Sequence, residues 1–366
     1  MQLPPFLLDH WLAAHQFATP PIRYNIASST GPTWTLGELL AIGDRDTTSL
    51  DEVALSYAPP QGSRALREQV AGLYGVDPDW VIITTGANEA VLAMYCLVAE
   101  RDGSIVVPAP MFPTFRSLAN AWSLQVSTYQ LDRHQAFVQT AELVLRAVDD
   151  STRLVLVNTP HNPTGSIMPA VEVQRLATAL AARGIPLLVD EVYHPLYFGA
   201  PLASAANVPD VTLVSDLSKA LSLPGLRTGW LIERDAERRK RLIDIRSYFT
   251  ISGSPLCEMI ATCALRQRDL ILARVTEVTR TNLSVLEQFM HAHRNDLAWI
   301  PPAGGTVTFP WRRDGRNTRS MCEAVARAGV LIAPGDCFDA PDHFRIGLGA
   351  QVDGFADALG ILSRNI

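Results

Sequence analysis

The chain contains two lysines, and one of them lies where a solvated surface charge would be out of place. Lys240 belongs to the charge run "RDAERRKR", which has the spacing of a solvated helix face. Lys219 lies instead in "SDLSKALSLPGLRTGW", among Ser, Leu, Ala and Gly, where an unpaired charge is costly to bury. Arginine serves better as a permanent charge, whereas a lysine amine can lose its proton and attack a carbonyl carbon to form a Schiff base. The sequence therefore predicts covalent catalysis through Lys219.

A turn that could bind an anion follows one apolar run. The segment "TTGANEA" places Gly86, Ala87 and Asn88 between an expected strand and an expected helix. The free amides and the dipole of a helix N-terminus favour an anionic group at such a turn. Neither a GxGxxG nor a GxxxxGK[ST] pattern occurs in the chain, so neither a dinucleotide nor a nucleoside triphosphate is indicated.

Further polar residues come where other apolar runs end. Asn162 lies in "NTPHNPTG", and Asp190 follows four apolar residues, at a place where a carboxylate needs a partner. Arg227 comes eight residues after Lys219, beyond a Pro-Gly turn that could fold it back. Together with the anion turn, these residues predict one site at successive strand ends of one sheet.

These residues require an α/β scaffold to position them. Strands are expected at residues 81–86, 104–110, 124–130, 153–160, 186–193, 212–216 and 229–233, with helical patterns between them. Strands that alternate with helices predict a mostly parallel sheet with helices on both faces. Ligands of such sheets bind beyond the carboxyl ends of the strands.

The alternation of strand and helix patterns ends with a long helical pattern at residues 270–293. The remaining segments, such as "PPAGGTVTFPW" and "HFRIGLG", are typical of a smaller α+β domain. We expect a large domain over residues 35–268 and a small domain built from residues 1–34 and 269–366. A chain of 366 residues is long enough for two such units.

Composition restricts the class of ligand. Hydrophobic residues make up 48% and charged residues 19%, and the net charge of −6 comes without a long basic or acidic block. We therefore expect a small-molecule ligand, with no nucleic acid and no membrane as partner. The five cysteines show no CxxC spacing, which predicts reduced thiols and no metal site. The N-terminal residues lack a basic, apolar leader, so a cytoplasmic location is expected.

Four motifs in this order and spacing carry a family resemblance: "NPTG", "DEVY", "LSKALSLPGLRTGW" and "FRIGLG". Over nearly its whole length the chain resembles the class I/II aminotransferases, which are fold-type I pyridoxal-phosphate enzymes. The resemblance implies pyridoxal 5'-phosphate as cofactor and Lys219 as the residue that forms a Schiff base with it.

The resemblance also implies roles around the cofactor ring. Asp190 would pair with the pyridine nitrogen and keep it protonated, so that the ring can accept electrons. Tyr193 and Asn162 would hydrogen-bond the phenolic oxygen of the ring. Phe112, in "APMFPTF", matches the aromatic residue that stacks on the ring.

The phosphate contacts are implied in the same way. The amides of the anion turn and the Arg227 side chain would hold the phosphate. One position departs from the pattern: many members carry serine three residues before the Schiff-base lysine, and here that residue is Asp216. Because a carboxylate repels phosphate, the neighbouring Ser215 or Ser218 is expected to take over that contact.

For the substrate, the resemblance assigns the α-carboxylate to Arg345 of "FRIGLG", whose planar fork suits two oxygens. Gly31 would help through its backbone amide, and Asn162 would face the same group. Tyr57, in "SYAPPQG", matches a tyrosine that reaches the phosphate of the neighbouring subunit. This implies a homodimer with shared active sites.

Three functions remain open. The first is an aminotransferase, which exchanges an amino group between an amino acid and a 2-oxo acid. The second is a lyase or cyclase, because "LPPFLLDHWL", "NIASSTGPTWTLGEL" and "IRSYFTISGSPLCE" are similar to capreomycidine synthases, which eliminate and cyclise on a hydroxylated arginine. The third, a non-catalytic descendant, is disfavoured because every expected catalytic position is filled. Retention of Tyr193 favours the aminotransferase.

Overall fold

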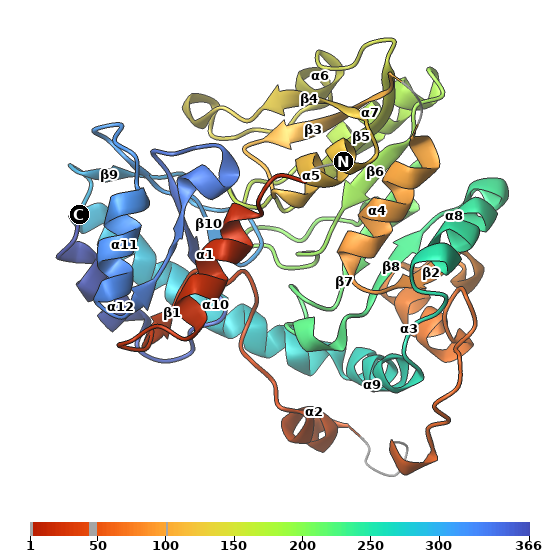
Figure 1. Ribbon diagram of the computed structural model, residues 1–366, viewed down its shortest axis with the longest axis horizontal. Coiled ribbons are helices and arrows are strands. Elements are labelled where there is room, and N and C mark those ends of the chain that lie inside the picture. Colours follow the sequence, from red (N-terminus) through yellow and green to blue (C-terminus); the bar gives the residue numbers. More distant parts are fainter. Residues whose placement is uncertain (1–2, 44–49, 100–101) are drawn as a thin grey trace.

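The computed structural model describes residues 3–43, 50–99 and 102–366, and its centre is a seven-stranded sheet (Figure 1). The strand order is β2-β8-β7-β6-β5-β3-β4. The strands are β2 (Val81–Thr84), β3 (Ser104–Ala109), β4 (Gln125–Gln130), β5 (Thr152–Asn158), β6 (Leu187–Asp190), β7 (Val211–Asp216) and β8 (Gly229–Ile232). Only β8 runs antiparallel to its neighbours, so the prediction of a mostly parallel α/β sheet is confirmed.

Several predicted strands extend past their observed ends, and the excess is largest at β6. The run "PLLVDEVY" indicated a strand up to residue 193, but β6 ends at Asp190 and a turn follows. The Glu191 backbone N–H still donates to the Val214 carbonyl (2.9 Å), whereas the Val192 N–H donates to the Asp190 carboxylate (3.1 Å). The turn directs the residues after β6 away from the sheet plane.

Both faces of the sheet are covered by helices, as alternating contacts along β5 illustrate. Leu154 and Leu156 pack into one hydrophobic core, and Val155 and Val157 pack into another on the opposite face. The helices of the first face are α4 (Ala87–Val98), α5 (Thr114–Ala121) and α8 (Ala236–Phe249). The helices of the second face are α3 (Arg64–Tyr74), α6 (Ala141–Leu145), α7 (Ala170–Ala181) and α9 (Pro255–Arg266). Burial on both sides explains why the strands are continuous apolar runs.

A third core joins residues from the two ends of the chain. The long helix α10 (Arg268–Ala292) runs from the sheet domain to this core (Figure 1). Around it lie α1 (Leu7–Gln16), α11 (Arg319–Arg327), α12 (Phe355–Ser363) and the short strands β1 (Tyr24–Asn25), β9 (Leu297–Ala298), β10 (Val307–Thr308), β11 (Trp311–Arg312), β12 (Val330–Leu331), β13 (Ala333–Pro334) and β14 (Phe344–Gly347). Strand β1 pairs with β12, which ties the N-terminal segment to the C-terminal one.

The domain boundaries at residues 35 and 268 stay a prediction. Within the predicted ranges, residues 1–2, 44–49 and 100–101 lie outside the described residues. Helix α2 (Leu36–Ile42) follows the first boundary and begins with a capping box between Thr35 and Glu38. No helix in the described ranges is long and apolar enough to cross a bilayer.

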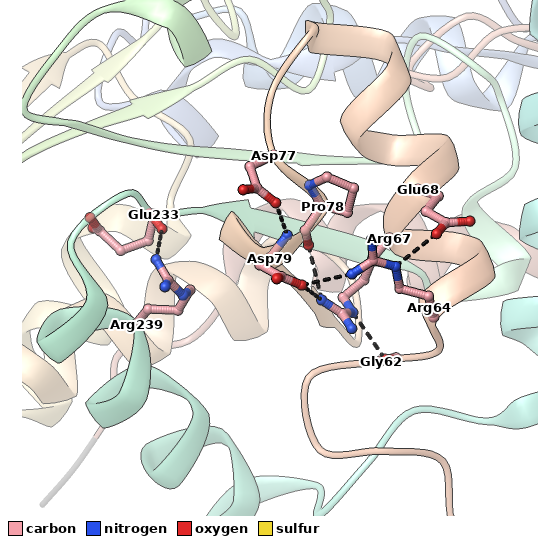
Figure 2. A network of polar contacts seen from close by, with 9 residues as sticks. All are labelled: Gly62, Arg64, Arg67, Glu68, Asp77, Pro78, Asp79, Glu233 and Arg239. Atoms are coloured by element: carbon pink, nitrogen blue, oxygen red, sulfur yellow. Dashed lines mark hydrogen bonds and ion pairs between the residues drawn. The ribbon is translucent and has the colours of Figure 1, made fainter.

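A polar network anchors the start of β2, at the edge of the sheet opposite the predicted site residues (Figure 2). The Arg67 guanidinium donates to the carbonyl oxygens of Gly62 (3.3 Å) and Pro78 (3.0 Å), and it also contacts the Asp79 carboxylate at 3.2 Å. These bonds connect α3 to the turn that begins β2. The strand is thereby held at its start while its end carries the anion turn.

Candidate active site

Four strand ends meet at one edge of the sheet and surround a cavity. Strands β2, β5, β6 and β7 run in the same direction and end at Thr84, Asn158, Asp190 and Asp216. The cavity beyond them has a volume of about 150 Å³. Its lining includes these predicted site residues: Ala87, Asn88, Phe112, Asn162, Asp190, Tyr193, Ser218, Lys219 and Arg227.

Lys219 lies in the turn after β7, with its amine in the cavity. The ammonium donates to the Ser29 hydroxyl at 2.9 Å. Burial lowers the pKa of Lys219, and the Asp216 carboxylate opposes this shift. Desolvation thus favours the neutral, nucleophilic amine that covalent catalysis needs.

Asp190 is a buried carboxylate at the end of β6, and only 6% of its surface is exposed. Burial raises its pKa to about 7, although the Val192 N–H that it accepts lowers the value. The Asp216 carboxylate raises this pKa further, while Lys219 lowers it. A carboxylate in such surroundings gains from any cation that enters the cavity.

A series of hydrogen bonds connects this edge of the sheet to the C-terminal part of the protein. The Asn158 side chain donates to the Asp190 carbonyl (3.2 Å) and accepts the backbone N–H of Asn162 (2.8 Å). The Asn162 side-chain oxygen accepts from Arg345 Nη1 at 3.1 Å. Asn162 therefore links the sheet edge to β14, which carries Arg345.

Arg345 is a buried cation without a matching anion. Its Nη2 donates to the Ala27 carbonyl (2.7 Å), and its guanidinium lies 4.9 Å from the centre of the Phe338 ring. In the described part of the chain its Nε has no hydrogen-bond partner and no carboxylate pairs with it. Because burial disfavours an unpaired charge, it lowers the pKa of Arg345. A carboxylate ligand would remove this penalty.

Tyr193 lies between these groups. Burial raises the pKa of Tyr193 to about 12, and the Arg345 cation and the Ser29 hydroxyl partly oppose the shift. Within the described residues its hydroxyl makes no hydrogen bond of good geometry. A polar ligand atom beside it would therefore gain a donor.

Close backbone packing shapes the anion turn. Gly86 precedes α4 with φ +76°, and a Cβ there would lie 2.5 Å from Arg227 Nη2. A Cβ on Gly229 would lie 2.6 Å from the carbonyl carbon of Gly86. The two glycines let the Arg227 guanidinium approach the N-terminus of α4, where Ala87 and Asn88 supply amides.

Asp216 lies in this cradle. Its Oδ1 accepts the Ser218 backbone N–H at 2.8 Å. Its Oδ2 accepts the Ser218 hydroxyl at 2.8 Å and the Ala87 N–H at 3.4 Å. The departure from the family pattern therefore places a carboxylate on an amide assigned to phosphate. Ser215 is directed elsewhere, because its hydroxyl donates to the Glu191 carbonyl.

Helix α1 lies beside the cavity. The Phe6 ring, just before the helix, contacts the Phe112 ring edge-on with centroids 5.9 Å apart. Partial burial raises the pKa of the Asp9 carboxyl, whereas His10 and Lys219 lower it. Asp9 itself is exposed and is not among the residues that line the cavity.

Four predicted residues do not line the cavity. Gly86 directly precedes the lining residue Ala87, and Arg345 reaches the lining residue Asn162 through a hydrogen bond. The other two lie farther away. Gly31 is packed between Val275 and Ser222, where a Cβ would come within 3.0 Å of each. Tyr57 is 79% exposed and borders a groove beside α9. The prediction for Tyr57 concerned the site of a neighbouring subunit, and no contact within this chain tests it.

Asn158 and Ser29 are site residues that sequence reasoning missed. Asn158 follows an apolar strand, as Asp190 does, so the same signal could have found it. Ser29 comes from the N-terminal segment and meets Lys219 only through the fold, with 190 residues between them. No local pattern marks such a residue.

Comparisons with known proteins agree with this geometry. Residues 44–358 match the family model "Aminotransferase class I and II". Capreomycidine synthase from Streptomyces vinaceus is 32% identical, over 94% of this chain and 89% of that protein.

Two solved structures share the whole fold. A PLP-dependent aminotransferase from Streptococcus suis superimposes with a TM-score of 0.91 and 26% identity, covering 100% of this chain and 98% of the other. The PLP-dependent cyclase OrfR superimposes with a TM-score of 0.88 and 28% identity, covering 100% and 97%. The chain therefore belongs to the class I and II aminotransferase family of fold-type I enzymes, and its cofactor is pyridoxal 5'-phosphate.

Proposed function

We propose that the protein is an aminotransferase that exchanges an amino group between an amino acid and a 2-oxo acid. The observation that carries the proposal is the position of Lys219, a buried amine of lowered pKa between an anion cradle and the Asp190 carboxylate. Bound in this cavity, the cofactor supplies an electron sink for negative charge at the substrate α-carbon. Lys219 Nζ would hold the cofactor, and as a neutral amine it would accept the proton of the substrate α-carbon.

The surrounding side chains fit the cofactor. The raised pKa of Asp190 reflects an unpaired buried charge, and a protonated ring nitrogen would compensate it. The buried Tyr193 hydroxyl and the Asn162 amide suit the phenolic oxygen, and the Phe112 ring borders the same space. The amides of Ala87 and Asn88 and the Arg227 guanidinium suit the phosphate.

Substrate binding falls to Arg345. Its unpaired guanidinium suits the α-carboxylate common to amino acids and 2-oxo acids, and Asn162 holds one of its nitrogens in place. We assign Gly31 a role through its backbone amide, as the family resemblance implies.

A lyase or cyclase is the second candidate. The similarity to capreomycidine synthase and to a PLP-dependent cyclase supports it. The specific observation is Asp9, a carboxyl group on α1 whose pKa the Lys219 charge lowers and which would attract a cationic side chain such as that of a hydroxylated arginine. The other residues of the site serve either reaction, since both begin with removal of the α-proton.

We further propose a cytoplasmic homodimer. The cysteines form no disulfide bond within the described residues, which supports a reducing location. The exposure of Tyr57 supports a contact with a second copy of the chain. The small-molecule substrates are the only other partners proposed.

The first experiment distinguishes the two reactions. Holoenzyme mixed with a panel of amino acids, followed by absorbance and mass spectrometry, should convert the cofactor to pyridoxamine phosphate and release a 2-oxo acid. An elimination product with an unchanged cofactor would overturn the aminotransferase in favour of the lyase.

Lys219→Ala should lower turnover about a thousandfold or more, while the matched variant Lys240→Ala keeps the wild-type rate. After borohydride reduction, a pyridoxyl group on Lys240 would contradict the role of Lys219.

In the cofactor-free protein, the buried charge of Asp190 should lower the free energy of unfolding. The folded state keeps the Asp190 proton up to about pH 7, whereas the unfolded chain releases it near 3.8. Stability should therefore fall as the pH rises through this window, by on the order of 4 kcal/mol. Urea unfolding should show that Asp190→Asn is the more stable protein above pH 7, with an advantage that shrinks toward pH 4.

Glu191, whose pKa burial also raises to about 7, is present in both proteins, so its titration cancels in the comparison. A difference that does not change with pH would mean that the Asp190 carboxyl carries no burial penalty. Added cofactor should reverse the order, because only the carboxylate can pair with a protonated ring nitrogen.

Asp9→Asn should reveal whether the enzyme recognises a cationic side chain. We expect kcat/KM for arginine to fall about fivefold to tenfold, the value of a partly exposed ion pair of ~1 kcal/mol, and kcat/KM for alanine to stay unchanged. Asp353→Asn removes an exposed carboxylate outside the cavity and serves as the control. Equal losses with arginine and alanine would show that Asp9 does not recognise the side chain.

Mixed dimers test the shared site. Lys219→Ala and Tyr57→Ala should each be nearly inactive. In a mixed dimer both lesions fall in one site and the other site stays intact, so co-refolding should recover about a quarter of wild-type activity. No recovery from verified mixed dimers, or a fully active monomer, would refute the contribution of Tyr57 across the interface.

A further inference from the structure

The carboxyl group of Asp216 lies at the position assigned to the cofactor phosphate. The residue is only 7% exposed and lines the cavity together with Ala87, Ser218 and Lys219. Its two oxygens are held differently: Oδ1 has one short bond to the Ser218 N–H, whereas Oδ2 has a bond to the Ser218 hydroxyl and a long one to the Ala87 N–H. The long bond marks Oδ2 as the oxygen that faces the cradle.

The charges around Asp216 do not balance a phosphate. Lys219 and Arg227 are the cations that border the same cavity. At the end of β6 lies Asp190, whose pKa the Asp216 charge raises, and Tyr193 follows it. Behind the turn lies Tyr74 on α3, whose pKa is raised first by burial and further by the charges of Glu191 and Asp216. A phosphate would therefore add two negative charges to a pocket that already holds several acids.

A proton at Oδ2 would solve this conflict without moving the side chain. The carboxylic acid would donate to a phosphate oxygen, and Oδ1 would keep the Ser218 N–H. The Ser218 hydroxyl and the Ala87 N–H would be free to turn to the phosphate. The neutral carboxyl group of Asp216 would then donate a hydrogen bond to the phosphate at the position where many relatives have serine.

We propose that binding of the cofactor phosphate is coupled to uptake of one proton by Asp216. The inference rests on the proposed cofactor site. The balance is simple: a carboxylate, a solvent proton and a phosphate dianion give a carboxylic acid hydrogen-bonded to the dianion. Because the bound state holds one more proton, affinity falls as pH rises, by up to tenfold per pH unit above about pH 7, where free phosphate is already a dianion.

Calorimetry of the cofactor-free protein with pyridoxamine 5'-phosphate measures the proton directly. This probe carries the phosphate but no aldehyde, so Lys219 cannot bond to it. At pH 8, titrations in two buffers of different ionisation enthalpy should give an uptake of about one proton for wild type. Asp216→Asn and Asp216→Ser should give about one proton less, and Asp216→Ser should bind at least tenfold more tightly at that pH.

Asp353→Asn is the control, because it removes an exposed carboxylate that does not line the cavity and should leave the proton number unchanged. Equal proton numbers in wild type and in both Asp216 variants would overturn the inference. If the variants do not fold, the wild type alone decides: an affinity that stays constant between pH 7.5 and 9 overturns the coupling. Absence of saturable binding at any pH would instead refute the cofactor site itself.

Discussion

Three ionisable groups, Lys219, Asp190 and Asp216, line one cavity, and the electrostatic balance among them determines what each can do. Lys219 is pushed toward its neutral form by burial and toward its charged form by Asp216. Asp190 is pushed toward its protonated form by the same burial and by the same neighbour. None of these side chains has a full counter-charge in the described protein, so the site is built to be completed by a ligand. A cofactor with a cationic ring would supply the partner that Asp190 lacks, whereas its anionic phosphate would have to be accommodated beside Asp216.

The scaffold makes this costly arrangement possible. The sheet is buried on both faces, and its parallel strands deliver side chains to one edge in register: Asn158 lies beside Asp190, and Asp216 lies beside Gly229. Gly229 in turn packs on Gly86, so the antiparallel strand β8 brings the anion turn against β7. The free energy gained by packing the hydrophobic cores therefore offsets the cost of desolvating the charged side chains. The strand order determines where these side chains lie.

The fold and the centre of the site were predictable, because their signals are local. A lone lysine in an apolar stretch, a carboxylate after an apolar strand and a glycine before a helix each leave a mark within a few residues. The end of β6 was misjudged because its limit depends on one side-chain bond to Asp190. No pattern in the sequence predicts that Ser29 contacts Lys219 or that the charge of Lys219 affects Asp9 on α1. The tertiary fold alone brings these distant segments together. For Asp216, the charge was visible in the sequence, but its bonds to Ser218 and Ala87 were not.

The choice between transfer and elimination does not depend on the groups that meet at the sheet edge. The roles that we propose for Lys219, Asp190 and Arg345 are a base, a partner of the electron sink and a carboxylate anchor, which any reaction that begins with loss of the α-proton requires. The later steps depend on how the rest of the substrate is held, because a leaving group departs only when its bond is aligned with the developing charge. Asp9 on α1, whose pKa the Lys219 charge lowers, is the acid to which we assign recognition of a cationic side chain in the proposed lyase or cyclase. That proposal makes the N-terminal helix the element whose variation would change reaction specificity while the residues at the sheet edge stay the same.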